Sequence, residues 1–327
     1  MDKLKNKFAI GCLVQFYEIE LVEEYINSLK ISLELTENKE NVLIDFCLNL
    51  NEDLEKLDSS KITMNEITKR FNLMLEDFEN VTLNINKDDI YTIADYRREF
   101  NEKYCELADV LMWGESDSLI PRQTWYILDK LHDSVKEKTP KYVSFFGTCK
   151  MWDKSWEILE HPDFTVKPFK DIGNRVETKD WWSLRYNMNQ HEMDKINEKT
   201  EELDIRTTNQ LKFNGCGLVI ASSVVKSGVN IPRSIFFIHE DTAFMNNCLI
   251  MFRGQLPQYI IKNILLVHNR KHIKKRMYIS GEDKINPGDV GGARKTHDWY
   301  TKANQLSEWN AHNLHTQERF YSWEDII

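Results

Sequence analysis

The sequence has few of the features that mark a secreted, disulfide-bonded or membrane-spanning protein. Its 327 residues include six cysteines but no CxxC pair, which argues against a disulfide framework and against a zinc site. The first apolar run, residues 8–16, is interrupted by Gln15 and is followed by no signal-peptide cleavage region. Such a run is too short to span a membrane. We therefore expect a cytoplasmic protein with reduced, buried thiols and no membrane partner.

The sequence also has fewer basic than acidic residues. The chain has 43 Lys and Arg against 52 Asp and Glu, a net charge of −9, which excludes a protein that coats nucleic acid through its overall charge and leaves only a local basic patch. A glycine-rich, basic phosphate loop is missing after the first apolar segment, where residues 11–15 read GCLVQ. This absence argues against a sugar-phosphate nucleotidyltransferase.

Apolar segments of two kinds alternate along the chain. Short buried runs predict strands at residues 7–16, 41–50, 110–113, 141–146 and 234–238. Helical spacing of apolar residues predicts helices at 18–33, 91–107, 121–135 and 190–210, and a mostly helical stretch at 51–90. Strands that alternate with helices predict an α/β fold with a doubly wound, mainly parallel sheet.

Two carboxylates follow the predicted strand at 110–113. Gly114 ends this strand, and Glu115-Ser116-Asp117 comes directly after it. In an open α/β sheet, ligands bind at the carboxyl ends of the strands, and residues i and i+2 of an extended segment point the same way. Glu115 and Asp117 are therefore expected to share Mg²⁺ or Mn²⁺. The alternative is a polar turn without a ligand.

A second acidic pair, Glu240-Asp241, follows the predicted strand at 234–238. Asp241 is a candidate catalytic base, and the alternative is an acid at a helix N-terminus, where the helix dipole stabilises it. Further on, His268 follows the apolar residues 264–267. It is either a metal ligand or the residue that ends a strand.

The order and spacing of these motifs resemble a known enzyme family. The set comprises a strand–helix opening, Arg98-x-x-Asn101, Glu115-Ser116-Asp117, Gly215-x-Gly217, Glu240-Asp241-Thr242 and His268. Over roughly residues 8–275 it is similar to the inverting GT-A glycosyltransferases of the broad family-2 type. The resemblance implies a GT-A, Rossmann-like domain at 1–275, with a donor half at about 1–120 and an acceptor half at about 121–275. Residues 276–327 are expected to form a C-terminal helical and loop extension that packs on the same domain.

The resemblance implies a metal site that holds Mn²⁺ or Mg²⁺. It assigns the metal chiefly to Asp117 and places Glu115 at the metal or the nucleotide. His268 matches a late metal-ligand histidine of the family, with His272 as a competitor.

The resemblance also implies catalytic and donor-binding residues. Asp241 matches the general base, with Glu240 beside it in the same catalytic motif. The residues expected at the nucleotide-sugar donor, besides the acids above, are Gln15, Tyr17, Asn49 and Arg98.

The function expected from the resemblance is transfer of a hexose or pentose from a nucleotide sugar, such as a UDP-sugar, to a hydroxyl with inversion. The acceptor is a glycan or other saccharide, or a hydroxymethylated DNA base as used by some bacteriophage enzymes, which would place the protein in the host cytoplasm. The basic stretch at residues 268–276 would grip a polyanion or form a solvated surface strand. The alternative is a non-catalytic sugar- or nucleotide-binding module, against which the two intact acidic motifs argue.

Three departures from the family pattern affect the donor more than the reaction class. The first acid of the triplet is Glu115 where the family has Asp, residues 14–17 lack the usual proline, and the second strand ends in an Asn-rich segment.

Overall fold

The computed structural model describes residues 3–19, 21–50, 63–87, 91–150, 188–207, 215–268 and 297–315. The strands are β1 Phe8–Gln15, β2 Val42–Asn49, β3 Val81–Asn86, β4 Val110–Trp113, β5 Ser118–Leu119, β6 Val143–Lys150, β7 Ile205–Thr207, β8 Val219–Ala221 and β9 Gln258–His268. The α-helices are α1 Val22–Leu33, α2 Met64–Leu75, α3 Ile93–Tyr104, α4 Thr124–Val135, α6 Gln190–Asn197, α7 Ser222–Lys226, α8 Glu240–Met251 and α10 His297–His312. Two short 3₁₀ helices cover Phe16–Glu18 and Lys39–Asn41.

The strands form one sheet in the order β3-β2-β1-β4-β8-β6-β9-β5, with β7 paired to β9. β1 pairs in parallel with both β2 and β4, and β3 pairs in parallel with β2. β6 and β9 are also parallel, whereas β8 is antiparallel to both of its neighbours. The predicted α/β class with a mainly parallel sheet is confirmed. The antiparallel β8 is an addition that the sequence did not predict.

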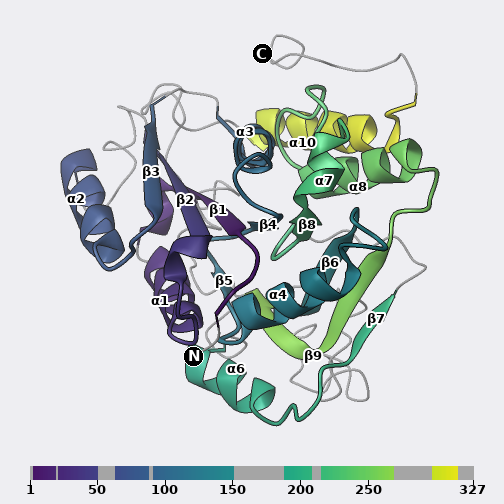
Figure 1. Ribbon diagram of the computed structural model, residues 1–327. Helices are drawn as coiled ribbons and strands as arrows, with labels where there is room; N and C mark the ends of the chain where they lie inside the picture. The colour runs from purple at the N-terminus through teal and green to yellow at the C-terminus, as the bar shows by residue number, and fades with distance from the viewer. Residues whose placement is uncertain are drawn as a thin grey trace, which may run out of the picture.

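Helices cover both faces of the sheet (Figure 1). On one face the apolar sides of α1 and α4, such as Ile26 and Trp125, pack into one buried cluster with the strands. On the other face α3, α7 and α8 form a second cluster that includes Phe100 and Phe244. The helices predicted at 18–33, 91–107 and 121–135 supply apolar residues to these layers, as their periodicity predicted, whereas α7 and α8 were not predicted from periodicity. Helix α10 lies against α8 rather than against the sheet.

Helix α3 packs on β1 at a glycine, which leaves room for aromatic side chains of the helix. A Cβ atom at Gly11 would overlap the ring of Phe100 and the hydroxyl oxygen of Tyr96. The helix begins at Ile93, directly after the N-cap residue Thr92, whose side chain accepts a hydrogen bond from the amide of Asp95 in a reciprocal capping box. These features fix the height of α3 on the sheet, and therefore the position of Arg97 one turn into the helix.

Three expectations about elements need correction. The apolar run 234–238 is not a strand; it belongs to an irregular segment whose carbonyl groups bind a side chain of α3, as described below. The segment 51–90 contains α2 but also the edge strand β3. This strand was not predicted because its sequence, VTLNIN, alternates apolar with polar residues and contains no apolar run. The helix predicted at 190–210 ends at Asn197 and is followed by β7.

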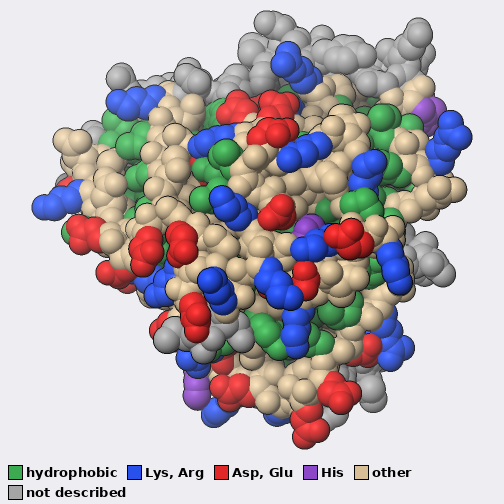
Figure 2. Space-filling model, in the orientation of Figure 1, with side chains coloured by type: hydrophobic (Ala, Val, Ile, Leu, Met, Phe, Trp, Pro, Cys, Tyr) green, Lys and Arg blue, Asp and Glu red, His purple; other side chains and the backbone are tan. Residues whose placement is uncertain are grey.

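Within the described ranges, no helix has the length and apolar character needed to cross a membrane. Figure 2 shows that, on the face in view, positive and negative side chains are interspersed over the sheet and its helices. The basic residues 269–276 lie outside the described residues.

Candidate active site

The acidic triplet forms a tight turn between β4 and β5. The amide of Ser118 donates a hydrogen bond to the carbonyl oxygen of Glu115 at 3.0 Å. Ser118 then pairs with His268 at the end of the antiparallel strand β9. Glu115 and Asp117 do meet at one place, as predicted, but through a turn and a cross-strand pair, not through an extended segment.

His268 lies between the two acids of the triplet. Its Nε2 atom is 2.8 Å from Glu115 Oε2 and 3.1 Å from Asp117 Oδ1. Asp117 and His268 are only 4% and 6% exposed. Burial opposes the charge of both Glu115 and His268, but neighbouring charges outweigh it: His268 and then Arg97 lower the pKa of Glu115, while Cys216, Glu115 and Asp117 raise the pKa of His268. Carboxylates and imidazole thus form a tightly coupled charged cluster.

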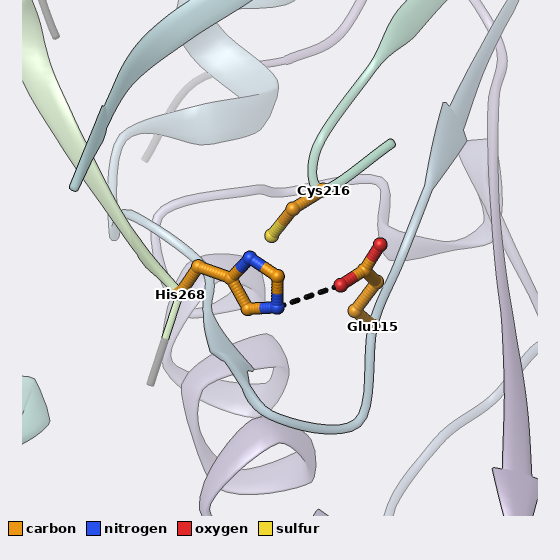
Figure 3. A group of neighbouring side chains, drawn as sticks. All are labelled: Glu115, Cys216 and His268. Carbon is orange, nitrogen blue, oxygen red and sulfur yellow. Dashed lines mark ion pairs between the residues drawn. The ribbon is translucent and has the colours of Figure 1, made fainter. Parts of the chain in front are cut away.

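Cys216 joins this cluster from a third segment. One ligand atom from each of Glu115, Cys216 and His268 lies within 4.8 Å of the other two. Figure 3 shows the sulfur of Cys216 beside the ring nitrogen of His268 that does not contact Glu115. The segment that carries it is paired with β4: the amide of Gly217 donates to the carbonyl of Trp113, and the amide of Trp113 donates to the carbonyl of Leu218, both at 2.9 Å.

Arg97 connects the acidic triplet to the second acidic pair. The residue is 1% exposed, and its side chain lies over the ring of Trp113, with the guanidinium carbon 4.7 Å from the ring centroid. Its Nη2 atom donates to Glu115 Oε1 at 2.8 Å and to the carbonyl of Gly215 at 3.1 Å, while Nη1 donates to Glu240 Oε1. One buried guanidinium therefore holds two carboxylates from elements far apart in the sequence.

The two acids at the start of α8 have different environments. Glu240 is buried against Arg97, and its burial, opposed by Arg97 and reinforced by Asp241, raises its pKa to about 7. Asp241 is half-buried, and its Oδ1 atom accepts a hydrogen bond from the amide of Thr242 at 2.7 Å. The residue before them, His239, has a φ of 65° in the left-handed region, which turns the chain sharply into the helix.

Polar side chains from the ends of β1, β2 and β3 form a hydrogen-bonded row. Asn49 Nδ2 donates to Gln15 Oε1 and to the carbonyl of Tyr91, both at 3.1 Å, and Asn86 Nδ2 donates to Asn49 Oδ1 at 2.9 Å. The predicted donor residues Gln15 and Asn49 are therefore brought together, and Asn86 joins them. All three end parallel strands, at the edge where open α/β sheets bind ligands.

Other predicted site residues make no described contact with the polar row at the ends of β1, β2 and β3. Arg98 donates to the carbonyls of Ile231, Pro232 and Ile235, so it fastens the irregular segment before α8. Its role at a donor stays a prediction. Tyr17 lies in the 3₁₀ helix after β1, with its side chain outside the described part, and His272 lies outside the described residues.

Sequence reasoning missed Arg97, Cys216 and Asn86. The signal for Arg97 was present: Ala94, Arg97 and Asn101 are spaced three and four residues apart, so they share one face of α3, and all three are buried. Cys216 and Asn86 carried no comparable signal, because their place depends on which strands are neighbours.

The residues present fit a divalent cation. One oxygen of each of two carboxylates lies within 3.1 Å of the same imidazole nitrogen, which gives the mixed oxygen and nitrogen donor set that first-row divalent metals accept.

No protein-family model matches the chain, and no curated protein matches it. The chain is similar to a structure of S. aureus TarS 1–349, with 10% identity and a TM-score of 0.47, over 98% of this chain and 76% of that one. A second S. aureus TarS structure has 8% identity and a TM-score of 0.48, over 98% of this chain and 46% of that one. These values assign neither a family nor an activity to the chain.

Proposed function

We propose that this protein is a divalent-metal-dependent glycosyltransferase, which moves a hexose or pentose from a nucleotide sugar, such as a UDP-sugar, to a hydroxyl acceptor with inversion. The observation that carries the proposal is that Arg97 forms ion pairs with two acids at once. One is Glu115, in the turn proposed to bind the metal, and the other is Glu240, at the start of α8. A displacement at a sugar carbon needs charge stabilisation on the leaving group and a base for the acceptor, and the two acidic motifs supply one group for each task.

The metal side of the site consists of Asp117, Glu115 and His268, which would hold Mn²⁺ or Mg²⁺. A bound divalent cation would act as a Lewis acid that stabilises the negative charge of the diphosphate leaving group. The chain's own residues hold this site in shape: Arg97 fixes one oxygen of Glu115, and the pairing of Ser118 with His268 fixes the imidazole beside Asp117.

The base side of the site consists of Asp241, with Glu240 as its anchor. Because Glu240 is buried against Arg97, the first turn of α8 is held at a fixed distance from the metal side. Asp241 is half-buried, and on this proposal its carboxylate takes the proton of the acceptor hydroxyl. The position of Asp241 in the first helical turn is also what the purely structural alternative predicts, so its role needs a direct test.

On this proposal, the nucleoside of the donor binds at the ends of β1 to β3. Gln15, Asn49 and Asn86 offer amide groups that can donate and accept hydrogen bonds, as recognition of a base or ribose requires. The acceptor remains open between a glycan and a hydroxymethylated DNA base.

The test is the substitution Asp241→Asn, which keeps the shape of the side chain and removes its basicity. We expect a loss of turnover of roughly 100-fold or more, the usual contribution of a general base, with the Kd for the nucleotide sugar unchanged. Asp77→Asn, at an exposed acid paired with Lys30, is the control and keeps full turnover. Equal turnover in the Asp241 variant would reject it as the base. Donor binding without turnover in the wild type would indicate a binding module.

A further inference from the structure

The cluster around His268 contains a sulfur atom that the proposed metal site does not use. Cys216 is 2% exposed, and its thiol belongs to the one group of three possible metal ligands found among the described residues, together with Glu115 and His268. Oxygen and nitrogen donors alone are compatible with Mn²⁺ or Mg²⁺, whereas a thiolate is a soft donor that selects Zn²⁺, Co²⁺ or similar ions. The presence of sulfur in this group therefore bears on which metal the site takes.

We propose that Cys216 is a direct ligand of the metal, so that the site binds Zn²⁺ or Co²⁺ through sulfur, imidazole and carboxylate in preference to Mg²⁺. The proposal rests on the metal centre of the proposed function but not on sugar transfer itself. It also revises the expectation, drawn from cysteine spacing, that the thiols take no part in a metal site. Spacing detects ligands that are close in sequence, and these three come from separate segments.

The distances allow a single ion to bind all three residues. With Zn–S near 2.3 Å and Zn–O up to about 2.2 Å, two ligands of one zinc ion lie at most about 4.5 Å apart. The three ligand atoms here lie within 4.8 Å of one another, slightly beyond this limit. Because the sulfur and Glu115 lie beside different ring nitrogens of His268 (Figure 3), binding of one ion requires the imidazole ring to shift along with the closure of the ligands. Asp117, 3.1 Å from His268 Nε2, supplies the fourth ligand that a tetrahedral site needs.

The backbone that carries Cys216 is held firmly at the site. Its neighbour Gly217 has a φ of 71° and is hydrogen-bonded to the end of β4, immediately before the acidic turn. The carbonyl of Gly215, on its other side, accepts a hydrogen bond from Arg97. A Cβ atom at Gly217 would lie 2.6 Å from Leu266 on β9, so β9 also packs directly on this segment. The three ligand-bearing segments are therefore packed on one another, and the thiol does not depend on a mobile loop.

The first experiment titrates the metal-free full-length protein with Co²⁺ and records its absorption spectrum. We expect a near-ultraviolet charge-transfer band from thiolate sulfur to cobalt. The band disappears in Cys216→Ser and persists in Cys105→Ser, a control at the end of α3 whose thiol contacts the carbonyl of Glu102. In the same Cys216 variant, Zn²⁺ affinity falls by roughly 100-fold or more while Mg²⁺ affinity is unchanged. A band that survives in the Cys216 variant overturns the proposal.

A second measurement needs no variant and so does not depend on whether the substituted protein folds. X-ray absorption of the zinc-loaded wild type is expected to show one sulfur neighbour at about 2.3 Å and nitrogen or oxygen neighbours at about 2.0–2.1 Å. A shell of nitrogen and oxygen alone, or no zinc binding at all, rejects the proposal. If sulfur is absent but turnover of a nucleotide sugar requires a divalent metal, the proposed function stands alone. If sulfur binds the zinc but no sugar is transferred, the proposal that Cys216 is a metal ligand is kept and the proposed glycosyltransferase function is rejected.

Discussion

At the scale of single residues, the site depends on Arg97. A buried guanidinium costs desolvation energy that only well-placed partners offset, and Arg97 has two carboxylates, a backbone carbonyl and an aromatic face. Lysine could not replace it, because a single ammonium group cannot donate in two fixed directions from a planar fork. The consequence is that the charge state of Glu240, the second carboxylate, is linked to folding.

The pH dependence of stability tests this linkage. In the folded chain the pKa of Glu240 is raised from 4.5 to about 7, mainly by burial. Between these values the folded state holds a proton that the unfolded state has lost, so this group's contribution to stability falls as pH rises from about 4.5 to 7. Integrated over that interval, the fall is about 3 kcal/mol.

The variant Glu240→Gln cannot ionise and lacks this fall. We expect the stability of the wild type minus that of the variant, measured by urea denaturation, to decrease from pH 5 to pH 7.5. Substitution of an exposed acid, Glu137→Gln, is the control for general effects of pH. A difference that is constant or increases with pH would contradict the burial of an ionisable Glu240 against Arg97.

The acids and His268 could be predicted from the sequence because each is a chemically distinctive residue that follows an apolar run. Glu115, Asp117, Glu240 and His268 were all predicted, and the structure brings them to one edge of the sheet. Arg98 was chosen in place of Arg97, although only Arg97 lies on the buried face of α3. Adjacent arginines look alike in a motif, and only the helical face separates them.

At the scale of elements, three short segments assemble the site: the turn between β4 and β5, the segment 215–218 before β8, and the start of α8. The turn and the strand β4 were predicted from an apolar run that ends at Gly114. The irregular entry to α8 was predicted as a strand because residues 234–238 are apolar. Those residues pack without pairing, since their carbonyls are bound by Arg98 and by Asn310 of α10. Apolar character alone cannot distinguish these two kinds of burial.

Gly215 tests how closely these segments fit. A Cβ atom here would overlap the guanidinium of Arg97 and lie 3.3 Å from Glu115 Oε1. We expect Gly215→Ala to destabilise the fold by about 1–3 kcal/mol, as overpacking does, and to weaken metal binding as well. Gly228→Ala is the comparison: its φ of 89° strains any side chain, but no atom lies within 4 Å. That variant should lose stability yet keep metal affinity, measured by calorimetry. Wild-type stability and metal affinity in Gly215→Ala would contradict this expectation, because the segment would then accommodate the added methyl group without displacing Arg97 or Glu115.

At the scale of the whole molecule, the sheet edge gathers groups from almost the full described length of the chain. Gln15 and Asn49 lie at the ends of β1 and β2, the acidic turn follows β4, and His268 ends β9. The alternation of strands and helices predicted this edge correctly. It did not predict the insertion of β8 between β4 and β6, which brings residues 215–218 to the site. Strand order is set by packing over long sequence separations, and no local pattern reports it.

Helix α10 completes the molecule on the side of α8. Asn246 of α8 donates to the carbonyl of Ala311 at 2.8 Å, and Asn310 of α10 donates to the carbonyl of Ser234 at 2.8 Å. His239, at the sharp turn before the acidic pair, contacts Asn304 at 3.2 Å. The C-terminal helix therefore supports the segment that carries Glu240 and Asp241. The boundaries expected for the domain, 1–275, and for the extension, 276–327, stay predictions.

The central claim, metal-dependent transfer of a sugar, is tested most directly by mass spectrometry. The full-length protein is incubated with Mn²⁺ or Zn²⁺, a pool of nucleotide sugars, and glycan, hydroxymethylated DNA or unmodified DNA. We expect release of a nucleoside diphosphate and a hexose- or pentose-sized mass gain on one acceptor, both abolished by a chelator and by Asp117→Asn. A gain confined to hydroxymethylated DNA would identify the acceptor as that base. If neither nucleoside diphosphate nor any mass gain appears while a nucleotide sugar binds, the protein is a binding module and the account is wrong.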